Sequence, residues 1–115
     1  MEQRKHFKIL DLQPTHIPKR STLAYYGSLS QEQLQKMPKP QVWASDLGPI
    51  ISDGNNYIFY HLRTGSQEIE ADYVEIPLQY SYLLESAILD AEIFRSYGIR
   101  SPKDLCKFMY CSIFP

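Results

Sequence analysis

The stretch DGNNYIFYHLRTGSQEIEADYV, residues 53–74, contains the two most regular patterns in the chain. Residues 53–56 are a strong turn signal and lead into the apolar run 57–62, which predicts a strand. Residues 68–73 then alternate acidic and apolar side chains, as a half-buried strand does. We therefore expect a β-hairpin over residues 56–75 whose outer face is acidic through Glu68, Glu70 and Asp72.

Shorter elements are expected before this hairpin. Residues 6–12 predict a first strand, because Phe7, Ile9 and Asp11 alternate with Lys8, Leu10 and Leu12 and no helix breaker occurs among them. Residues 23–27 predict a second, shorter strand. Ser28 or Ser30 can cap a brief helix that Pro38 ends.

Two helices are expected after the hairpin. Apolar residues recur at helical spacing between residues 78 and 97, and Pro77 suits the first turn of that helix. A shorter helix over residues 102–111 follows Ser101. With strands clustered before helices, we predict one α+β domain spanning residues 1–115, in which a small, mainly antiparallel sheet packs against these two helices.

Charge is distributed unevenly along the chain. Residues 41–95 contain nine carboxylates and only two arginines, whereas both ends are basic, and the formal net charge is -1. Tyrosine is abundant, with nine residues, and suits half-buried surfaces and interfaces. These features predict an acidic surface that meets a basic partner.

The sequence also supports expectations about location and cofactors. It contains no run of apolar residues long enough to cross a bilayer and no signal-peptide pattern, so we expect no membrane partner. Cys106 and Cys111 lie five apart in a predicted helix and are interpreted as free thiols, which favours a cytoplasmic protein. No zinc-type ligand spacing occurs, so neither a metal nor another cofactor is expected.

The leading hypothesis is a non-enzymatic protein-binding module, such as an inhibitor, an immunity-type protein or a viral or phage accessory protein. It would dock its acidic hairpin face on another protein with a basic surface. Trp43, the only tryptophan, either pins a loop to the core or anchors the partner. The candidate partner-binding residues are Glu68, Glu70, Asp72, Glu75 and Trp43.

Two alternatives stay open. The basic ends could contact nucleic acid, and residues 97–103 resemble the turn of helix-hairpin-helix DNA-binding proteins, although Arg100 replaces its second glycine. The candidate phosphate contacts are Arg4, Lys5, Lys8, Arg100, Lys103 and Lys107. The other alternative is a small enzyme, which requires His61 or a cysteine in a concave pocket with a perturbed pKa. A homodimer is compatible with every one of these hypotheses.

Overall fold

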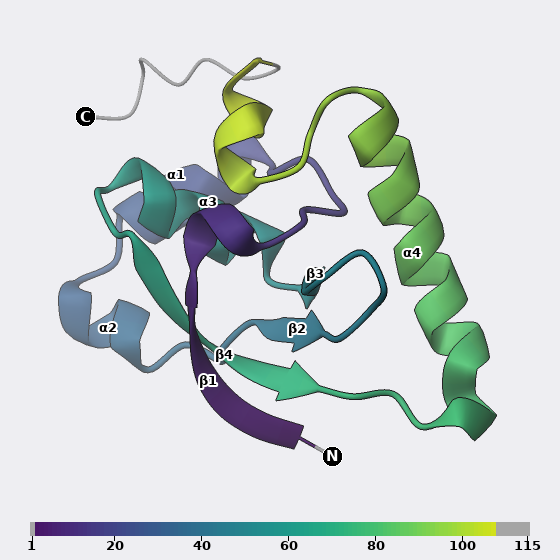
Figure 1. The fold of residues 1–115 in the computed structure, drawn as a ribbon. Helices are drawn as coiled ribbons and strands as arrows, with labels where there is room; N and C mark the ends of the chain where they lie inside the picture. The colour runs from purple at the N-terminus through teal and green to yellow at the C-terminus, as the bar shows by residue number, and fades with distance from the viewer. Residues whose placement is uncertain (1, 108–115) are drawn as a thin grey trace.

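The computed structural model describes residues 2–107, in which helices flank a four-stranded sheet (Figure 1). The strands are β1 (Glu2–Lys8), β2 (Gln41–Trp43), β3 (Ile50–Asp53) and β4 (Glu68–Val74). Their order across the sheet is β1-β4-β2-β3, in which β4 pairs antiparallel with β1 and parallel with β2, and β2 pairs antiparallel with β3. The sheet is mainly antiparallel, and the predicted α+β class is confirmed.

The α-helices described are α1 (Arg20–Gly27), α2 (Gln31–Gln35), α3 (Asn55–Arg63) and α4 (Ser81–Ser96). Short 3₁₀ helices form at η1 (Ile9–Asp11), η2 (Leu78–Tyr80) and η3 (Pro102–Lys107). Because η2 runs directly into α4, the long helix predicted over residues 78–97 is confirmed. The shorter terminal helix is represented by η3, and the remainder of its predicted range, 108–111, lies outside the described residues.

The strand predicted over residues 57–62 is wrong, because these residues belong to α3. Tyr57, Ile58 and Phe59 are all buried, since α3 lies between two core clusters. Ile58 packs in the cluster that includes the inward side chains of the sheet, whereas Phe59 packs in a second cluster with Leu23, Ile99 and Leu105. Consecutive apolar residues in a short run also occur in a buried strand, so this run by itself does not distinguish a strand from a buried helix.

Since residues 57–62 are helical, the hairpin predicted over residues 56–75 does not form, and β4 pairs with β1 and β2 instead. The alternation predicted within β4 is confirmed: Ile69 and Ala71 are buried, whereas Glu68 is exposed and Glu70 is half-buried. The inward residues contribute to the same core cluster as Ile58.

The polar residues of the predicted turn join α3 to the loop that follows η1. Gly54 has φ +96° and reverses the chain between β3 and α3. The Asn55 Oδ1 accepts a hydrogen bond of 3.1 Å from the Thr15 backbone N–H, and the Asn55 Nδ2 donates one of 3.1 Å to Thr15 Oγ1. The Asn56 Oδ1 accepts a 2.7 Å bond from the Lys19 N–H. These bonds tie the loop to the start of α3.

Other differences lie in the N-terminal half. The first strand covers residues 2–8 rather than 6–12, and residues 9–11 turn away from the sheet as η1. The strand predicted at residues 23–27 is wrong, because Leu23 and Tyr26, three residues apart, both pack toward the interior from α1. Strands β2 and β3 were not predicted.

The brief helix predicted after Ser28 or Ser30 is confirmed, and Ser30 caps it in a capping box. The Ser30 Oγ accepts a hydrogen bond from the Gln33 N–H at 3.1 Å, and the Gln33 Oε1 accepts one from the Ser30 N–H at 2.8 Å. This pair satisfies two backbone donors at the start of α2.

Cys106 is disulfide-bonded, so the interpretation of its sulfur as a free thiol is wrong. A bonded cysteine removes the reason for inferring a reducing compartment. No helix among residues 2–107 is long and apolar enough to cross a membrane. A cytoplasmic location stays a prediction.

Candidate functional site

The carboxylates expected to form an acidic face lie on β4, and each lies opposite a basic residue of β1. The register gives three opposing pairs: Arg4 with Asp72, His6 with Glu70, and Lys8 with Glu68. The Arg4 Nε donates a hydrogen bond of 2.8 Å to Asp72 Oδ1. Opposite charges that face each other across two strands stabilise their pairing by roughly 0.2–1 kcal/mol. Cations from β1 therefore accompany the carboxylates of this face.

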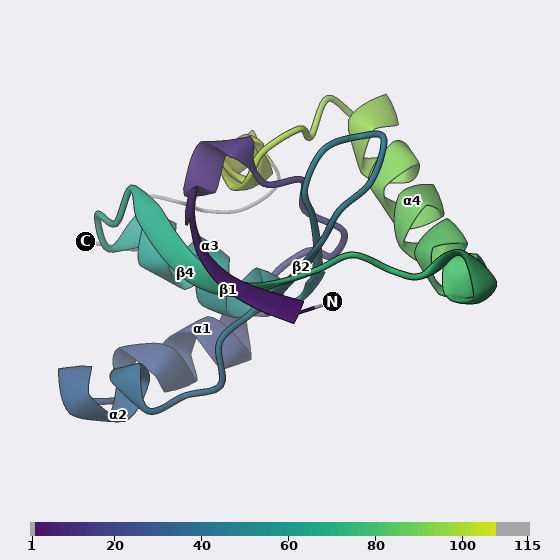
Figure 2. The same cartoon turned by 60° about the horizontal axis from the view of Figure 1, so that its bottom comes forward.

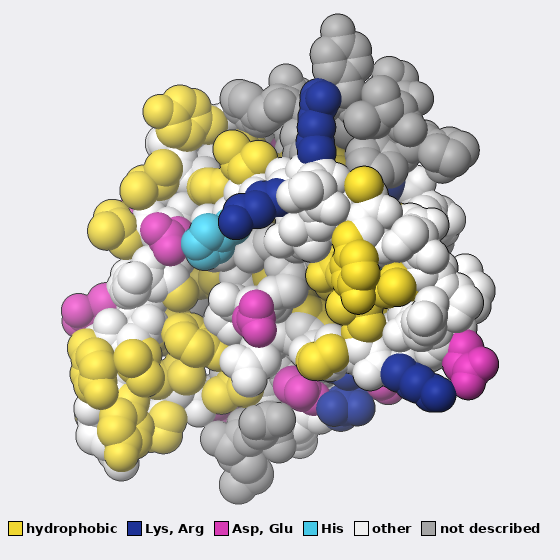
Figure 3. All heavy atoms as spheres, turned by 180° about the vertical axis from the view of Figure 1, so that it is seen from behind, with side chains coloured by type: hydrophobic (Ala, Val, Ile, Leu, Met, Phe, Trp, Pro, Cys, Tyr) yellow, Lys and Arg dark blue, Asp and Glu magenta, His cyan; other side chains and the backbone are white. Residues whose placement is uncertain are grey.

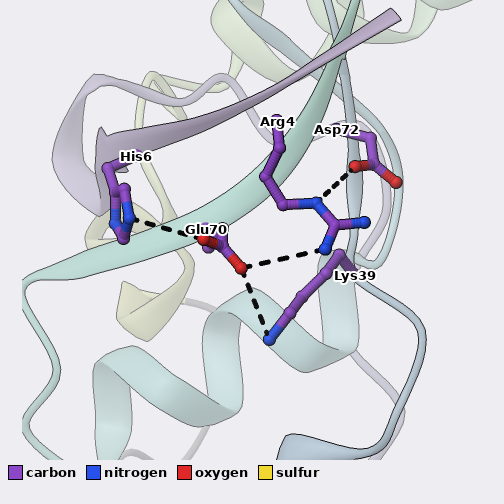
Figure 4. A network of polar contacts seen from close by, with 5 residues as sticks. All are labelled: Arg4, His6, Lys39, Glu70 and Asp72. Carbon is purple, nitrogen blue, oxygen red and sulfur yellow. Dashed lines mark hydrogen bonds and ion pairs between the residues drawn. The ribbon is translucent and has the colours of Figure 1, made fainter.

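Glu70 lies at the centre of a network of basic side chains (Figure 4). Its Oε2 lies 3.4 Å from His6 Nε2, and its Oε1 lies 3.9 Å from both Arg4 Nη1 and Lys39 Nζ. The Lys39 side chain reaches the network from the segment between α2 and β2. These partly exposed ion pairs contribute little stability individually, but they offset the charge of the carboxylate.

The charges around β4 balance. Apart from the histidines, the group contains three cations, Arg4, Lys8 and Lys39, and three carboxylates, Glu68, Glu70 and Asp72. A group without net charge exerts a weaker field on a basic partner than β4 alone would exert. The sequence shows the carboxylates of β4, but the cations opposite them come from distant parts of the chain.

A hollow of about 390 Å³ lies beside this network, between α2, α3 and the β1–β4 pair. Polar side chains dominate its walls. The lining residues are His6, Gln31, Leu34, Gln35, Lys39, Tyr57, Tyr60, His61, Thr64, Ser66, Glu68, Ile69 and Glu70. The residues come from β1, α2, α3, β4 and the segments between them, so no single sequence motif indicated this site.

His61 forms part of the wall of the hollow and lies on α3 rather than on a strand. Its ring centroid lies 4.4 Å from that of Tyr57 and 5.9 Å from that of Tyr60. Burial lowers the pKa of the His61 imidazole, and the positive charge of Lys39 lowers this pKa further. Burial likewise raises the pKa of the Tyr57 phenol.

The small-enzyme alternative required a residue such as His61 in a concave pocket with a perturbed pKa, and His61 has both features. Its Nε2, however, is buried in the wall and has no hydrogen-bond partner among the described residues. A buried nitrogen cannot exchange a proton with a ligand in the hollow unless the ring moves. The thiol that the same hypothesis invoked at Cys106 is disulfide-bonded.

Trp43 and Glu75 lie near α4, in hollows that none of the residues around Glu70 line. Trp43 is half-buried on β2 and lines a hollow of about 160 Å³ together with Leu83 and Ala87 of α4. Glu75 follows β4 and lines a further hollow of about 370 Å³ with Leu84 of α4. Neither residue belongs to the network around Glu70. Trp43 lies on β2 rather than in a loop, and it shares this hollow with α4.

The longest helix, α4, is poorly covered by the rest of the molecule. Ala91 is its only buried residue, and the hollows beside Trp43 and Glu75 separate parts of α4 from the body of the molecule. Figures 1 and 2 both show α4 standing at one side of the sheet. An apolar helix that buries one residue exposes much of its hydrophobic surface to water.

An apolar stripe runs along the outward side of η2 and α4. Its side chains are between 47% and 87% exposed. We define the outward stripe as Leu78, Tyr82, Leu89, Ile93 and Tyr97. Tyr82, Leu89 and Ile93 fall within roughly 40° of one another around the axis of α4, Leu78 precedes them in η2, and Tyr97 directly follows α4. In Figure 3, hydrophobic side chains gather at the left edge, where α4 lies in that view. The sequence carried a signal for this surface, because apolar residues occur on every side of the helix.

The residues predicted to contact nucleic acid do not form an unopposed basic surface. Arg4 pairs with Asp72, Lys8 lies opposite Glu68, and the Lys5 Nζ lies 4.6 Å from the centroid of the Tyr73 ring. Near the other end, the Asp104 Oδ2 accepts hydrogen bonds from the backbone N–H groups of Arg100 and Ser101. Lys103 and Lys107 belong to η3. Acidic side chains thus lie beside Arg4 and Lys8.

No family model and no curated protein matches the chain. Among solved structures, the chain is similar to the crystal structure of protein Atu1540 from Agrobacterium tumefaciens, with 11% sequence identity and a TM-score of 0.49. The match covers 76% of this chain and 49% of that one, so it spans about half of that protein.

Proposed function

We propose that this protein is a non-enzymatic protein-binding module that docks the outward stripe of η2 and α4 on another protein. The partner presents an apolar groove whose rim carries lysine and arginine. Such a module acts by occupying its partner's surface, as an inhibitor, an immunity-type protein or a viral or phage accessory protein does. The observation that carries the proposal is the exposure of five large apolar side chains along η2, α4 and the residue that follows α4.

The apolar part of the proposal follows from the cost of hydrating that stripe. Leu89 is 60% exposed and Ile93 is 47% exposed. Fully burying a leucine or isoleucine side chain stabilises a protein by about 1.5–3 kcal/mol, so burying what is left of these two yields roughly 2–3 kcal/mol of gross stabilisation. Tyr82 and Tyr97 add large amphipathic rings of the kind enriched at interfaces.

The basic part of the proposal follows from the charges beside the stripe. Glu85 and Glu92 lie along one edge of it, and Asp90 lies toward the other edge. Arg95 is the only basic residue of α4. A groove with a basic rim complements these carboxylates and is attracted to them at long range. A second copy of this chain would instead bring like charges together, because a two-fold interface presents the same patch twice.

This proposal keeps the class of function expected from the sequence and moves the main docking surface. The cations of β1 and Lys39 offset Glu68, Glu70 and Asp72, so these carboxylates contribute less to partner attraction than Glu85, Asp90 and Glu92. Trp43 contacts the partner only if the interface extends from the outward stripe to the hollow that Trp43 lines with Leu83 and Ala87.

The test is an affinity capture from lysate of the source cell, in which matched variants are compared with the wild-type chain. The double variant Leu89→Ser/Ile93→Ser removes the centre of the stripe. Its control is Ile17→Ser, which changes an isoleucine that is 55% exposed and lies before α1. The proposal predicts a protein that is retained by wild type and Ile17→Ser, lost with the double variant, and weakened by high salt.

Two outcomes contradict the proposal. One is a partner that the double variant retains as well as wild type does, since this partner uses another surface. The other is that the wild-type chain self-associates in sedimentation, that the double variant abolishes this self-association, and that no captured protein needs Leu89 and Ile93 for its retention. That outcome assigns the stripe to a homodimer. Circular dichroism of each variant verifies that its fold is intact.

A further inference from the structure

We infer that the hollow between α2, α3 and the β1–β4 pair binds a neutral, hydroxyl-rich ligand of the size of one or two sugar rings. This site is separate from the outward stripe of α4, and the inference does not depend on the proposed function. It rests on the charges, hydrogen-bonding groups, rings and size of the hollow.

The charges argue for a neutral ligand. Glu68, Glu70 and Lys39 line the hollow, and Arg4, Lys8 and Asp72 lie outside its lining, so the charges balance over the wider group. An anion in the hollow would lie beside the Glu70 carboxylate, and a cation would lie beside the Lys39 ammonium group. Either ion would lose part of its attraction to this repulsion. His61 adds no opposing charge at neutral pH, because burial keeps its imidazole uncharged.

The hydrogen-bonding groups argue for a ligand with hydroxyls. Gln31 and Gln35 are four residues apart on one face of α2 and both line the hollow. Neither side chain forms a hydrogen bond within the described part of the chain, and Glu68 forms no ion pair there. Amides donate and accept, and the Glu68 carboxylate accepts, so together they match hydroxyl groups, which do both.

The rings and the size argue for a carbohydrate rather than a small alcohol. Tyr60, which is half-buried, and Tyr57, which is 6% exposed, both line the hollow, and aromatic residues with a few polar groups are typical of small-molecule sites. At about 30 Å³ per water molecule, a hollow of about 390 Å³ has the room of roughly a dozen waters. One or two sugar rings fit within it.

The test is a titration of the ¹⁵N-labelled chain by NMR. The neutral probes are glucose, N-acetylglucosamine, maltose and cellobiose, and the charged probes are inorganic phosphate and arginine. The inference predicts that at least one neutral probe gives saturable shifts confined to residues 31–39 and 57–70. Phosphate and arginine should give no saturable shifts in these segments.

Variants of α2 make the test specific. The Gln31→Ala/Gln35→Ala double variant should weaken binding of the neutral probe by about tenfold or more, because it removes two hydrogen-bonding amides. Both glutamines are exposed and lie outside the capping box, so the fold is expected to persist. The control Gln79→Ala, in η2, should leave the affinity unchanged.

Three results would overturn the inference. They are the absence of saturable shifts with every neutral probe, saturable binding of phosphate or arginine alone, and binding of a neutral probe that the α2 double variant leaves unchanged. The first identifies a surface hollow that holds only solvent, and the second identifies a site for ions.

Discussion

Replacing Gly54 with alanine should destabilise the protein strongly, because Gly54 joins β3 to α3 at a place without room for a side chain. Its φ is +96°, in the left-handed region that L side chains rarely adopt. A Cβ at this position would lie 2.5 Å from the Pro40 Cβ and 3.0 Å from the Pro40 Cα. The proline ring cannot rotate away from such a contact, so the backbone must move.

The magnitude has two parts. A left-handed conformation costs a non-glycine residue about 1–2 kcal/mol, and overpacking a rigid site costs about 1–3 kcal/mol. We therefore expect Gly54→Ala to lower the free energy of unfolding by roughly 2–5 kcal/mol, which corresponds to a fall in Tm on the order of 10–20 °C. Urea denaturation followed by circular dichroism measures the first quantity, and a thermal scan measures the second.

Two other glycines provide controls. Gly48 has φ +87° but a Cβ there would meet no atom within 4 Å, so Gly48→Ala should show the backbone cost alone. Gly27 ends α1 without a positive φ or a close neighbour, and Gly27→Ala should stabilise the protein by about 0.5–1 kcal/mol. If Gly54→Ala costs no more than Gly48→Ala, the close approach of residue 54 to Pro40 is refuted.

Three further predictions concern the core and the charged face. Phe59→Ala should cost about 3–5 kcal/mol in urea denaturation, because Phe59 is 1% exposed; a cost below 1 kcal/mol would contradict its burial. The pKa of His61 is lowered in the folded state, so its contribution to stability is present above its unfolded pKa of about 6.5 and is lost as pH falls toward the folded value. His61→Gln should therefore reduce the loss of stability between neutral and mildly acidic pH, and an unchanged loss would refute this. A double-mutant cycle on Arg4→Met and Asp72→Asn should give a coupling below about 1 kcal/mol, since the Arg4 side chain is 53% exposed; a much larger coupling would show that the pair is effectively buried.

Local patterns were interpreted correctly where one segment contains all the interacting groups. The capping box of Ser30 and Gln33 lies within four residues, and the long helix carries its apolar residues at helical spacing along its own length. The alternation of β4 also held, because a strand with one buried face imposes a period of two on its sequence.

The run at residues 57–62 could not be interpreted from its own sequence. Tyr57, Ile58 and Phe59 are consecutive and all buried, since Leu23 and Leu105 cover one side of α3 and the sheet covers the other. The layer that covers the second side comes from α1 and η3, which are distant in sequence. When that layer is not known, the same apolar run fits a buried strand and a buried helix equally well.

The two candidate sites differ in whether the sequence alone could have indicated them. The outward stripe of α4 could have been found, because the helix has more apolar residues than one buried face requires. The hollow could not, because Gln35, Lys39, His61 and Glu70 meet only when α2, α3 and β4 have packed together.

By itself, the sequence determined the α+β class, the long helix, the reversal of the chain at Gly54 and the alternation of β4, since each depends on contacts between residues close in the chain. Only the tertiary structure decided that residues 57–62 are helical, that β1 and Lys39 offset the carboxylates of β4, and that α4 keeps an apolar face in water. Each of these features depends on which residues from distant parts of the chain pack against the segment. The pattern of residues within one segment contains no information about those packing partners.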